Sequence, residues 1–132
     1  MENGHHTDIN QLIQLIISLS KNIRRQLGPG YLESVYKNAM VVELRKHNLS
    51  YEVERPSRVL YDDIVVGDFK ADIVVDNRLI LELKAVQNLS VAHEVQLVNY
   101  LTSTGINDGM LINFGSLQLQ FKHKYRVYTR QF

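Results

Sequence analysis

Two charged side chains stand out in this sequence of 132 residues, because their spacing would place both on one face of an apolar strand. Residues 79–84 read LILELK, so Glu82 and Lys84 lie two positions apart. Side chains alternate between the faces of a strand, so these two share a face. Charged groups are almost never buried in a strand without partners. Glu82 and Lys84 therefore need other charged groups, or a bound ion, beside them.

The turn at residues 76–78 decides whether a second carboxylate joins them. A two-residue turn would set Asp72 opposite Leu81 and so place a charged side chain on the apolar face of the hairpin. A three-residue turn sets Asp72 opposite Glu82 instead. Only the second register keeps charged and apolar side chains on separate faces, because a slip of one residue moves every side chain to the other face. We therefore expect Asp72 and Glu82 to be cross-strand neighbours.

Two carboxylates this close repel each other, and one would normally take up a proton. A divalent cation removes the conflict, since Mg²⁺ and Mn²⁺ prefer hard oxygen ligands of this kind. Lys84, one step further along the same face, would then lie beside whatever the metal holds. A structural salt bridge from Lys84 to Asp72 or Glu82 is the alternative. The residue types alone leave both interpretations open.

Hydrophobic periodicity predicts the elements that position these residues. Apolar residues at helical spacing predict helices at 9–27, 32–46 and 90–103. Alternation and turn residues predict strands at 51–53, 59–61, 64–66, 69–75, 79–83, 110–114 and 117–121. This order is typical of an α/β fold with a mixed sheet and not of a doubly wound nucleotide-binding fold. In the third helix, the expected apolar side is formed by Val91, Val95, Val98 and Leu101.

Composition points to an ordinary globular protein. Hydrophobic residues make up 45% of the chain and charged residues 22%, and there is no cysteine. We expect a single domain over residues 1–132, with 1–7 flexible, and neither a disulfide framework nor a thiolate metal site. No apolar run approaches the ~20 residues of a membrane span, and no secretory signal pattern opens the chain. A cytoplasmic protein that does not bind membranes is expected.

Charge is nearly balanced overall, at +1, but it is unevenly distributed. No acidic residue follows Asp108, whereas basic residues crowd the segment 122–132. This basic tail could contact phosphates. A solvated terminal strand is an equally simple interpretation.

The charged cluster resembles the signature of a known nuclease superfamily. Asp72, nine intervening residues and then Glu82-Leu83-Lys84 are similar to the motif of the PD-(D/E)XK nucleases. The usual proline before the aspartate is replaced by Ala71. The resemblance implies a restriction-endonuclease-like α-β-β-β-α-β core, with a mixed sheet flanked by helices.

A second stretch narrows the resemblance. Residues 30–36, GYLESVY, fit the Gly-x-x-Glu-x-x-Tyr pattern of the GxxExxY family of small proteins in that superfamily. The similarity extends over residues 9–121 and includes the stretches LGPGYLESVY, HEVQLVNYL and LINFG.

The resemblance also implies site residues. The metal ligands would be Glu33, Asp72, Glu82 and the carbonyl oxygen of Leu83, and Lys84 would act with the three carboxylates as the catalytic set. Glu33 lies in the first turn of the second expected helix. A glutamate there ordinarily does no more than stabilise the helix dipole.

The third helix carries another similarity. Gln96-x-x-x-Tyr100 resembles a motif of the recombination-exonuclease branch, where it lies beside the active site. His93 lies on the same stripe of the helix, three residues before Gln96. We interpret His93 as a residue that contacts substrate or supports the ligands. A cap interaction at the start of the helix is the alternative.

Taken together, the resemblance implies a Mg²⁺- or Mn²⁺-dependent nuclease that hydrolyses phosphodiester bonds, with DNA favoured over RNA as substrate. The modest net charge suggests help from a homodimer or a protein partner in binding nucleic acid. Two alternatives remain. One is a non-catalytic module that retains the fold and binds nucleic acid or protein. The other is an accessory subunit of a larger complex.

Overall fold

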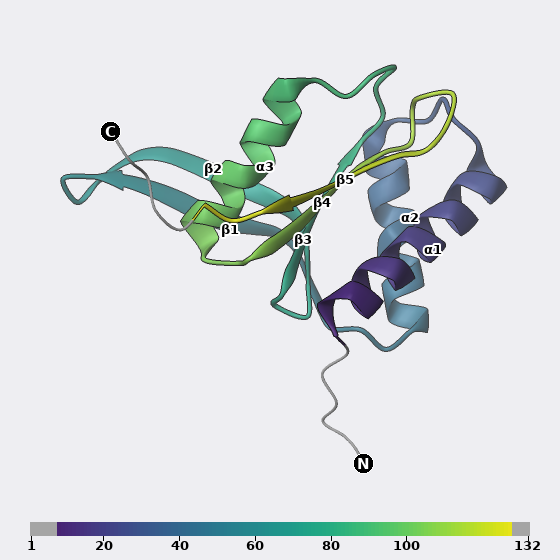
Figure 1. Cartoon of the computed structure of the whole chain (residues 1–132), viewed down its shortest axis with the longest axis horizontal. Helices are drawn as coiled ribbons and strands as arrows, with labels where there is room; N and C mark the ends of the chain where they lie inside the picture. Colours follow the sequence, from purple (N-terminus) through teal and green to yellow (C-terminus); the bar gives the residue numbers. More distant parts are fainter. Residues whose placement is uncertain (1–7, 128–132) are drawn as a thin grey trace, which may run out of the picture.

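The computed structural model describes residues 8–127 (Figure 1). Its helices are α1 (Ile9–Leu27), α2 (Glu33–Lys46) and α3 (Val91–Thr104). Its strands are β1 (Tyr51–Tyr61), β2 (Ile64–Val75), β3 (Leu79–Lys84), β4 (Asp108–Asn113) and β5 (Gln120–Tyr125). The predicted α-β-β-β-α-β order is confirmed, with one helix before this core and one strand after it. No helix among the described residues is long and apolar enough to cross a membrane.

The five strands form one mixed sheet in the order β1-β2-β3-β4-β5. Neighbouring strands are antiparallel except β3 and β4, which are parallel because α3 connects them. Helices α1 and α2 lie on one side of the sheet and α3 on the other (Figure 1). A large core fills the α1–α2 side, and a smaller core fills the α3 side.

Local sequence explains how α1 and α2 begin and end. Asp8 caps α1, where its side chain accepts a hydrogen bond from the Asn10 N–H at 3.0 Å. Gly28 ends the helix with φ of 70°, a conformation that glycine adopts readily. Helix α2 begins at Glu33, and Leu32 at its N-cap is 78% exposed. The helix expected from about residue 32 thus begins one position later, because Leu32 adopts an extended conformation.

Strands β1 and β2 are longer than the alternation predicts. Each runs without a break through the positions where we expected gaps, and together they form a long hairpin. Asp62 and Asp63, between the strands expected at 59–61 and 64–66, form its turn, and both have positive φ, at 50° and 63°. Gly67 lies inside β2 beside a bulge rather than ending the strand.

The C-terminal strand begins at Gln120, three residues later than expected, and continues to Tyr125. The first part of the predicted basic tail is therefore an edge strand paired with β4. Within it, Lys124 forms an ion pair with Glu94 of α3 at 3.1 Å. The segments 1–7 and 128–132 lie outside the described residues.

Helix α3 faces the sheet with a different side from the one expected. Its buried residues are Leu97, Tyr100 and Leu101, whereas Val91 is 74% and Val95 53% exposed. The expected valine stripe is therefore wrong for those two positions. The buried stripe includes Tyr100 because its ring packs edge-on against Phe69 of β2, with 5.4 Å between centroids.

Candidate active site

The hairpin between β2 and β3 has the predicted register. Its three-residue turn pairs Val75 with Leu79, and Ile73 pairs with Leu81. Continuing this register sets Asp72 opposite Glu82. The paired positions end at Ile73 and Leu81, so the two strands separate where the two carboxylates meet.

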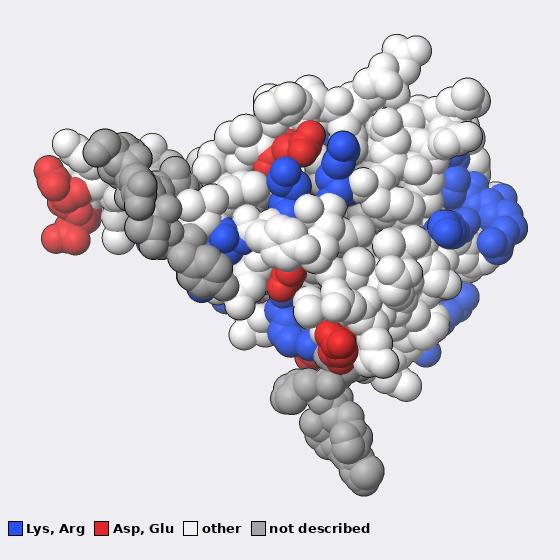
Figure 2. Space-filling view, in the orientation of Figure 1, with Lys and Arg blue, Asp and Glu red and all other residues white. Residues whose placement is uncertain are grey.

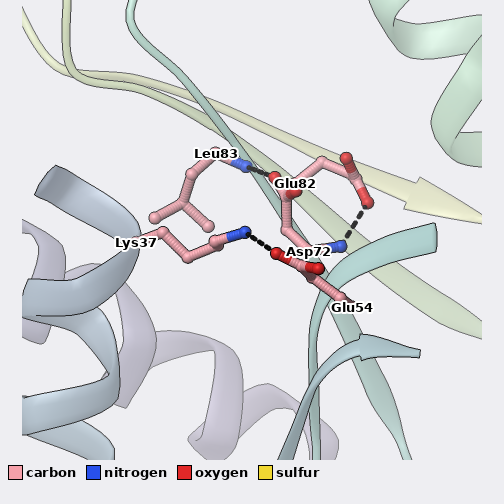
Figure 3. Close-up of polar contacts among 5 residues, drawn as sticks. All are labelled: Lys37, Glu54, Asp72, Glu82 and Leu83. Carbon is pink, nitrogen blue, oxygen red and sulfur yellow. Dashed lines mark hydrogen bonds and ion pairs between the residues drawn. The ribbon is translucent and has the colours of Figure 1, made fainter. Parts of the chain in front are cut away.

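Where the two strands separate, backbone N–H groups donate hydrogen bonds to side-chain carboxylates instead of to backbone carbonyls (Figure 3). The Leu83 N–H donates to Oδ2 of Asp72 at 2.9 Å, and the Asp72 N–H donates to Oε1 of Glu82 at 3.0 Å. Within a strand, the N–H and C=O of one residue point toward the same neighbouring strand. The Leu83 carbonyl therefore faces the same opening as the Asp72 carboxylate.

Strand β2 changes its buried face at Asp72. Regular alternation would place Ala71 and Ile73 on one face, but Ala71 packs in the core on the α3 side and Ile73 in the core on the α1–α2 side. On the neighbouring strand, Val53 pairs with Ile73, and the next residue, Glu54, has φ of 53°. The backbone is therefore irregular on both strands at this point, and the alternation of β2 side chains between the two faces of the sheet is broken at Asp72.

Glu82 lies in a strongly unfavourable environment for a negative charge. The residue is only 5% exposed. Burial, and then the adjacent Asp72 carboxylate, raise the pKa of Glu82 to about 8, against the opposing effects of the Asp72 N–H and the Lys84 ammonium. In the absence of a bound cation, Glu82 is therefore largely protonated at neutral pH.

Glu33 approaches this pair from the first turn of α2. Partial burial raises its pKa and Asp72 raises it further, whereas Lys84 and Lys37 lower it. These effects show that Glu33 lies within electrostatic range of the β2–β3 site. Even so, among residues 8–127 no three His, Cys, Asp or Glu side chains are close enough together to form a metal-binding group. Asp72 and Glu82 are brought together, and Glu33 lies further away.

Lys84 is the last residue of β3 and is partly buried. It interacts electrostatically with Glu33 and Glu82. Within the described chain it forms no ion pair at 4.0 Å or less, so the expected alternative of a salt bridge to Asp72 or Glu82 is not formed. The ammonium is therefore available to a ligand.

The segment after Lys84 is held by the end of β4. The Val86 N–H donates to Oδ1 of Asn113 at 3.0 Å, and Nδ2 of Asn113 donates to the Val86 carbonyl at 2.9 Å. Asn113 is fully buried and lies beside Lys84 in the parallel register. These bonds fix the direction in which the chain leaves β3.

Tyr100 borders the site from α3, and Gln96 lies about one turn before it on the same helix. Burial, with the added effect of Glu82 and Asp72, raises the pKa of Tyr100 to about 12. Its hydroxyl therefore stays protonated at physiological pH. Gln96 and Tyr100 both line a cavity of about 310 Å³. The predicted proximity of Tyr100 to the carboxylates is thus present.

His93 takes part in the cap of α3. Its Nδ1 accepts a hydrogen bond from the Ser90 N–H at 3.1 Å, and its own N–H donates to the Ser90 hydroxyl at 3.4 Å. This is the cap interaction that the sequence left open. His93 nevertheless lowers the pKa of Glu33, so it lies within electrostatic range of the site as well.

An ion pair that the sequence reasoning missed borders the site. Nζ of Lys37 lies 3.0 Å from Oε2 of Glu54, joining α2 to β1 (Figure 3). One feature of the sequence could have indicated that Lys37 lies near the site: it follows Glu33 by four residues and is therefore on the same face of the helix. The Lys37 ammonium also lowers the pKa of Glu33.

Comparison with known proteins agrees with this geometry. A family model described as the PD-(D/E)XK nuclease superfamily matches residues 10–126. No curated protein matches the chain. The solved structure titled "Crystal structure of SSO0001" is similar over 71% of this chain, with a TM-score of 0.57 and 18% sequence identity, and the match spans half of that protein. At this identity the likeness concerns the fold alone. From the extent of the family match, this chain belongs to the PD-(D/E)XK nuclease superfamily.

Proposed function

We propose that this protein is a metal-dependent nuclease that hydrolyses phosphodiester bonds, with DNA as its substrate. The observation that carries the proposal is the meeting of Asp72 and Glu82 at the opening between β2 and β3, with Lys84 next on the same face. Family membership supports the reaction class.

The side chains at the opening fit a hard divalent cation such as Mg²⁺ or Mn²⁺. Asp72 and Glu82 supply carboxylate oxygens, the Leu83 carbonyl faces the same space, and Glu33 approaches from α2. The raised pKa of Glu82 means that a proton occupies this carboxylate unless a cation replaces it. When bound, a divalent cation polarises the scissile phosphate and lowers the pKa of a bound water.

Lys84 performs the complementary role. Its ammonium has no ion-pair partner in the described chain, so it is free to donate hydrogen bonds to a phosphate oxygen or to orient the attacking water. Charge-assisted bonds of this kind stabilise the negative charge that develops in the transition state. Tyr100, Gln96 and His93 would contact the substrate strand or steady the carboxylates from α3.

Within the superfamily, we propose that the chain is a member of the GxxExxY family, and the contacts of Tyr36 and Gly30 support a structural role for that pattern. The Tyr36 hydroxyl donates to the Gly28 carbonyl at 2.6 Å and accepts from the Tyr31 N–H at 3.2 Å. Gly30 has φ of 112°, which favours glycine. Through these two hydrogen bonds Tyr36 stabilises the loop between α1 and α2. This loop leads directly into α2 and so positions Glu33 in its first turn.

A second function is favoured by one observation. Each carboxylate accepts a backbone N–H from the opposite strand, so Asp72 and Glu82 also hold the hairpin together. A non-catalytic module that binds nucleic acid or protein, or an accessory subunit, would keep these bonds without cleaving anything.

Cleavage assays distinguish the two functions. Purified protein is incubated with labelled single- and double-stranded DNA and RNA in Mn²⁺ or Mg²⁺, beside Asp72→Asn and the control Asp68→Asn, an exposed acid of β2. The nuclease proposal requires cleavage by the wild type and by Asp68→Asn, but not by Asp72→Asn. Binding of DNA with no cleavage in either metal favours the binding module.

A further inference from the structure

The β1–β2 hairpin carries an exposed apolar surface at its far end. It projects from the body of the molecule at the left of Figure 1. The exposed apolar residues of its tip are Leu60 (58%), Tyr61 (70%), Ile64 (66%), Val65 (48%) and Val66 (61%). We call residues 60–66 the arm tip. A cluster of exposed apolar side chains on a protruding strand pair marks an interaction site or an aggregation hazard.

A groove lies beside the arm tip, where the same hairpin meets α3. The groove has a volume of about 550 Å³. One wall is formed by the hairpin and the other by α3, and the lining residues are Arg58, Val59, Leu60, Phe69, Asn99, Thr102 and Ser103. The molecule therefore presents an apolar projection and, directly beside it, a recess of mixed apolar and polar lining, with Leu60 at the border of the two.

Charges on the two surfaces are opposite in sign. Asp62 and Asp63 form the turn of the arm tip, and acidic side chains are visible at the left end of Figure 2. Arg58 lines the groove. None of these three side chains forms a hydrogen bond or ion pair within the described part of the chain. All three charges are thus available to a partner.

We propose that the arm tip docks into the groove of a second copy of this chain, and the groove accepts the arm tip of that copy in return. Two hairpins lying antiparallel about a two-fold axis bring each arm tip beside the groove of the other copy. In such an interface a contact from one residue to another is repeated in the reverse direction. Asp62 and Asp63 of each copy would then pair with Arg58 of the other, and the apolar side chains of both tips would be buried.

A nucleic acid is a poorer occupant of this surface. The tip is acidic and apolar, and phosphates would be repelled by Asp62 and Asp63. A second copy satisfies both the apolar and the charged parts of the surface. This inference does not depend on the proposed nuclease activity, and its test needs no substrate.

Sedimentation velocity over a range of protein concentrations tests the dimer. We expect wild type to shift from monomer to dimer with increasing concentration, and Ile64→Thr to weaken dimerisation about tenfold or more. Leu117→Thr is the matched control, since Leu117 is 95% exposed but lies on the β4–β5 loop. It should dimerise as wild type does. A wild type that remains monomeric at all concentrations would overturn the proposal.

Charge exchange tests the pairing itself. Arg58→Asp alone and the double variant Asp62→Arg/Asp63→Arg should each be largely monomeric, because like charges then face each other. Mixing the two variants should restore a dimer, since both contacts are again opposite in sign. Thermal melts verify that each variant folds. The double variant Asp62→Asn/Asp63→Asn removes the negative charges with a residue type that tolerates positive φ, so it tests the charges without straining the turn. Failure of the mixture to dimerise, or full dimerisation of every variant alone, contradicts the proposed contact.

Discussion

The Asp72 backbone N–H donates a hydrogen bond to Oε1 of Glu82 at 3.0 Å, across the point where β2 and β3 separate. The Asp72 carboxylate in turn accepts the Leu83 N–H. Two acidic side chains are therefore held near one another by neutral donors on opposite strands. These bonds keep the carboxylates oriented but do not cancel the unfavourable environment of a second negative charge, so Glu82 keeps its proton unless a cation replaces it.

Metal binding should stabilise the folded protein. A ligand that binds only the folded state at a hundred times its Kd adds about 2.7 kcal/mol to the free energy of unfolding. We expect the melting temperature to rise with Mn²⁺ concentration, and Asp72→Asn to abolish most of that rise. Asparagine still accepts the Leu83 N–H, so the variant should fold. Asp68→Asn serves as the control, and an absence of any wild-type shift would count against a metal-dependent enzyme.

The pH dependence of stability should reveal Glu82. Its pKa is about 8 in the folded protein and near 4.5 when unfolded, so the folded state binds more protons between these values. The free energy of unfolding must therefore fall as pH rises from about 4.5 to 8, by up to a few kcal/mol. Denaturant unfolding at several pH values, without divalent metal, measures this. Glu82→Gln should flatten the profile, and a slope equal to that of wild type would refute the assignment to Glu82.

Lys84→Ala separates a catalytic lysine from a structural one. If the ammonium stabilises the transition state, its loss should lower turnover by roughly 100-fold or more while Mn²⁺ still raises the melting temperature. Lys84→Arg should restore little activity, because a guanidinium is planar and differs from an ammonium in position and acidity. Cleavage rates and melts of the same preparations provide the comparison. Full activity with a markedly lower melting temperature would make Lys84 structural.

Gly115 should be required for the packing of the segment after Lys84. A Cβ at this position would lie 2.5 Å from the Ala85 carbonyl carbon and 2.6 Å from the Val86 nitrogen, both backbone atoms. Gly115→Ala should therefore lower the free energy of unfolding by about 1–3 kcal/mol. At Gly67 a Cβ would meet only ordinary contacts at 3.5 Å, so Gly67→Ala should change it by less than about 1 kcal/mol. Equal effects in denaturant unfolding would show that the close approach is unimportant.

Much of the β2–β3 site was predictable because it depends on short-range rules. The number of residues in the turn and the two-residue period of a strand together place Asp72 opposite Glu82. The side-chain hydrogen bonds to the opposite strand were not predictable. They form because the strands separate there, and no local pattern marks the last paired residue.

By itself, the sequence determined the order of elements, the turn between the strands at residues 62–63, and the shared face of Glu82 and Lys84. Each of these follows from residues close in the chain. Tertiary structure alone decided which side of α3 is buried, how far Glu33 lies from the two opposed carboxylates, and that Lys37 pairs with Glu54. Those features arise where elements distant in sequence pack together, and the side chains that fill the space between them select one helix face from several of similar hydrophobicity.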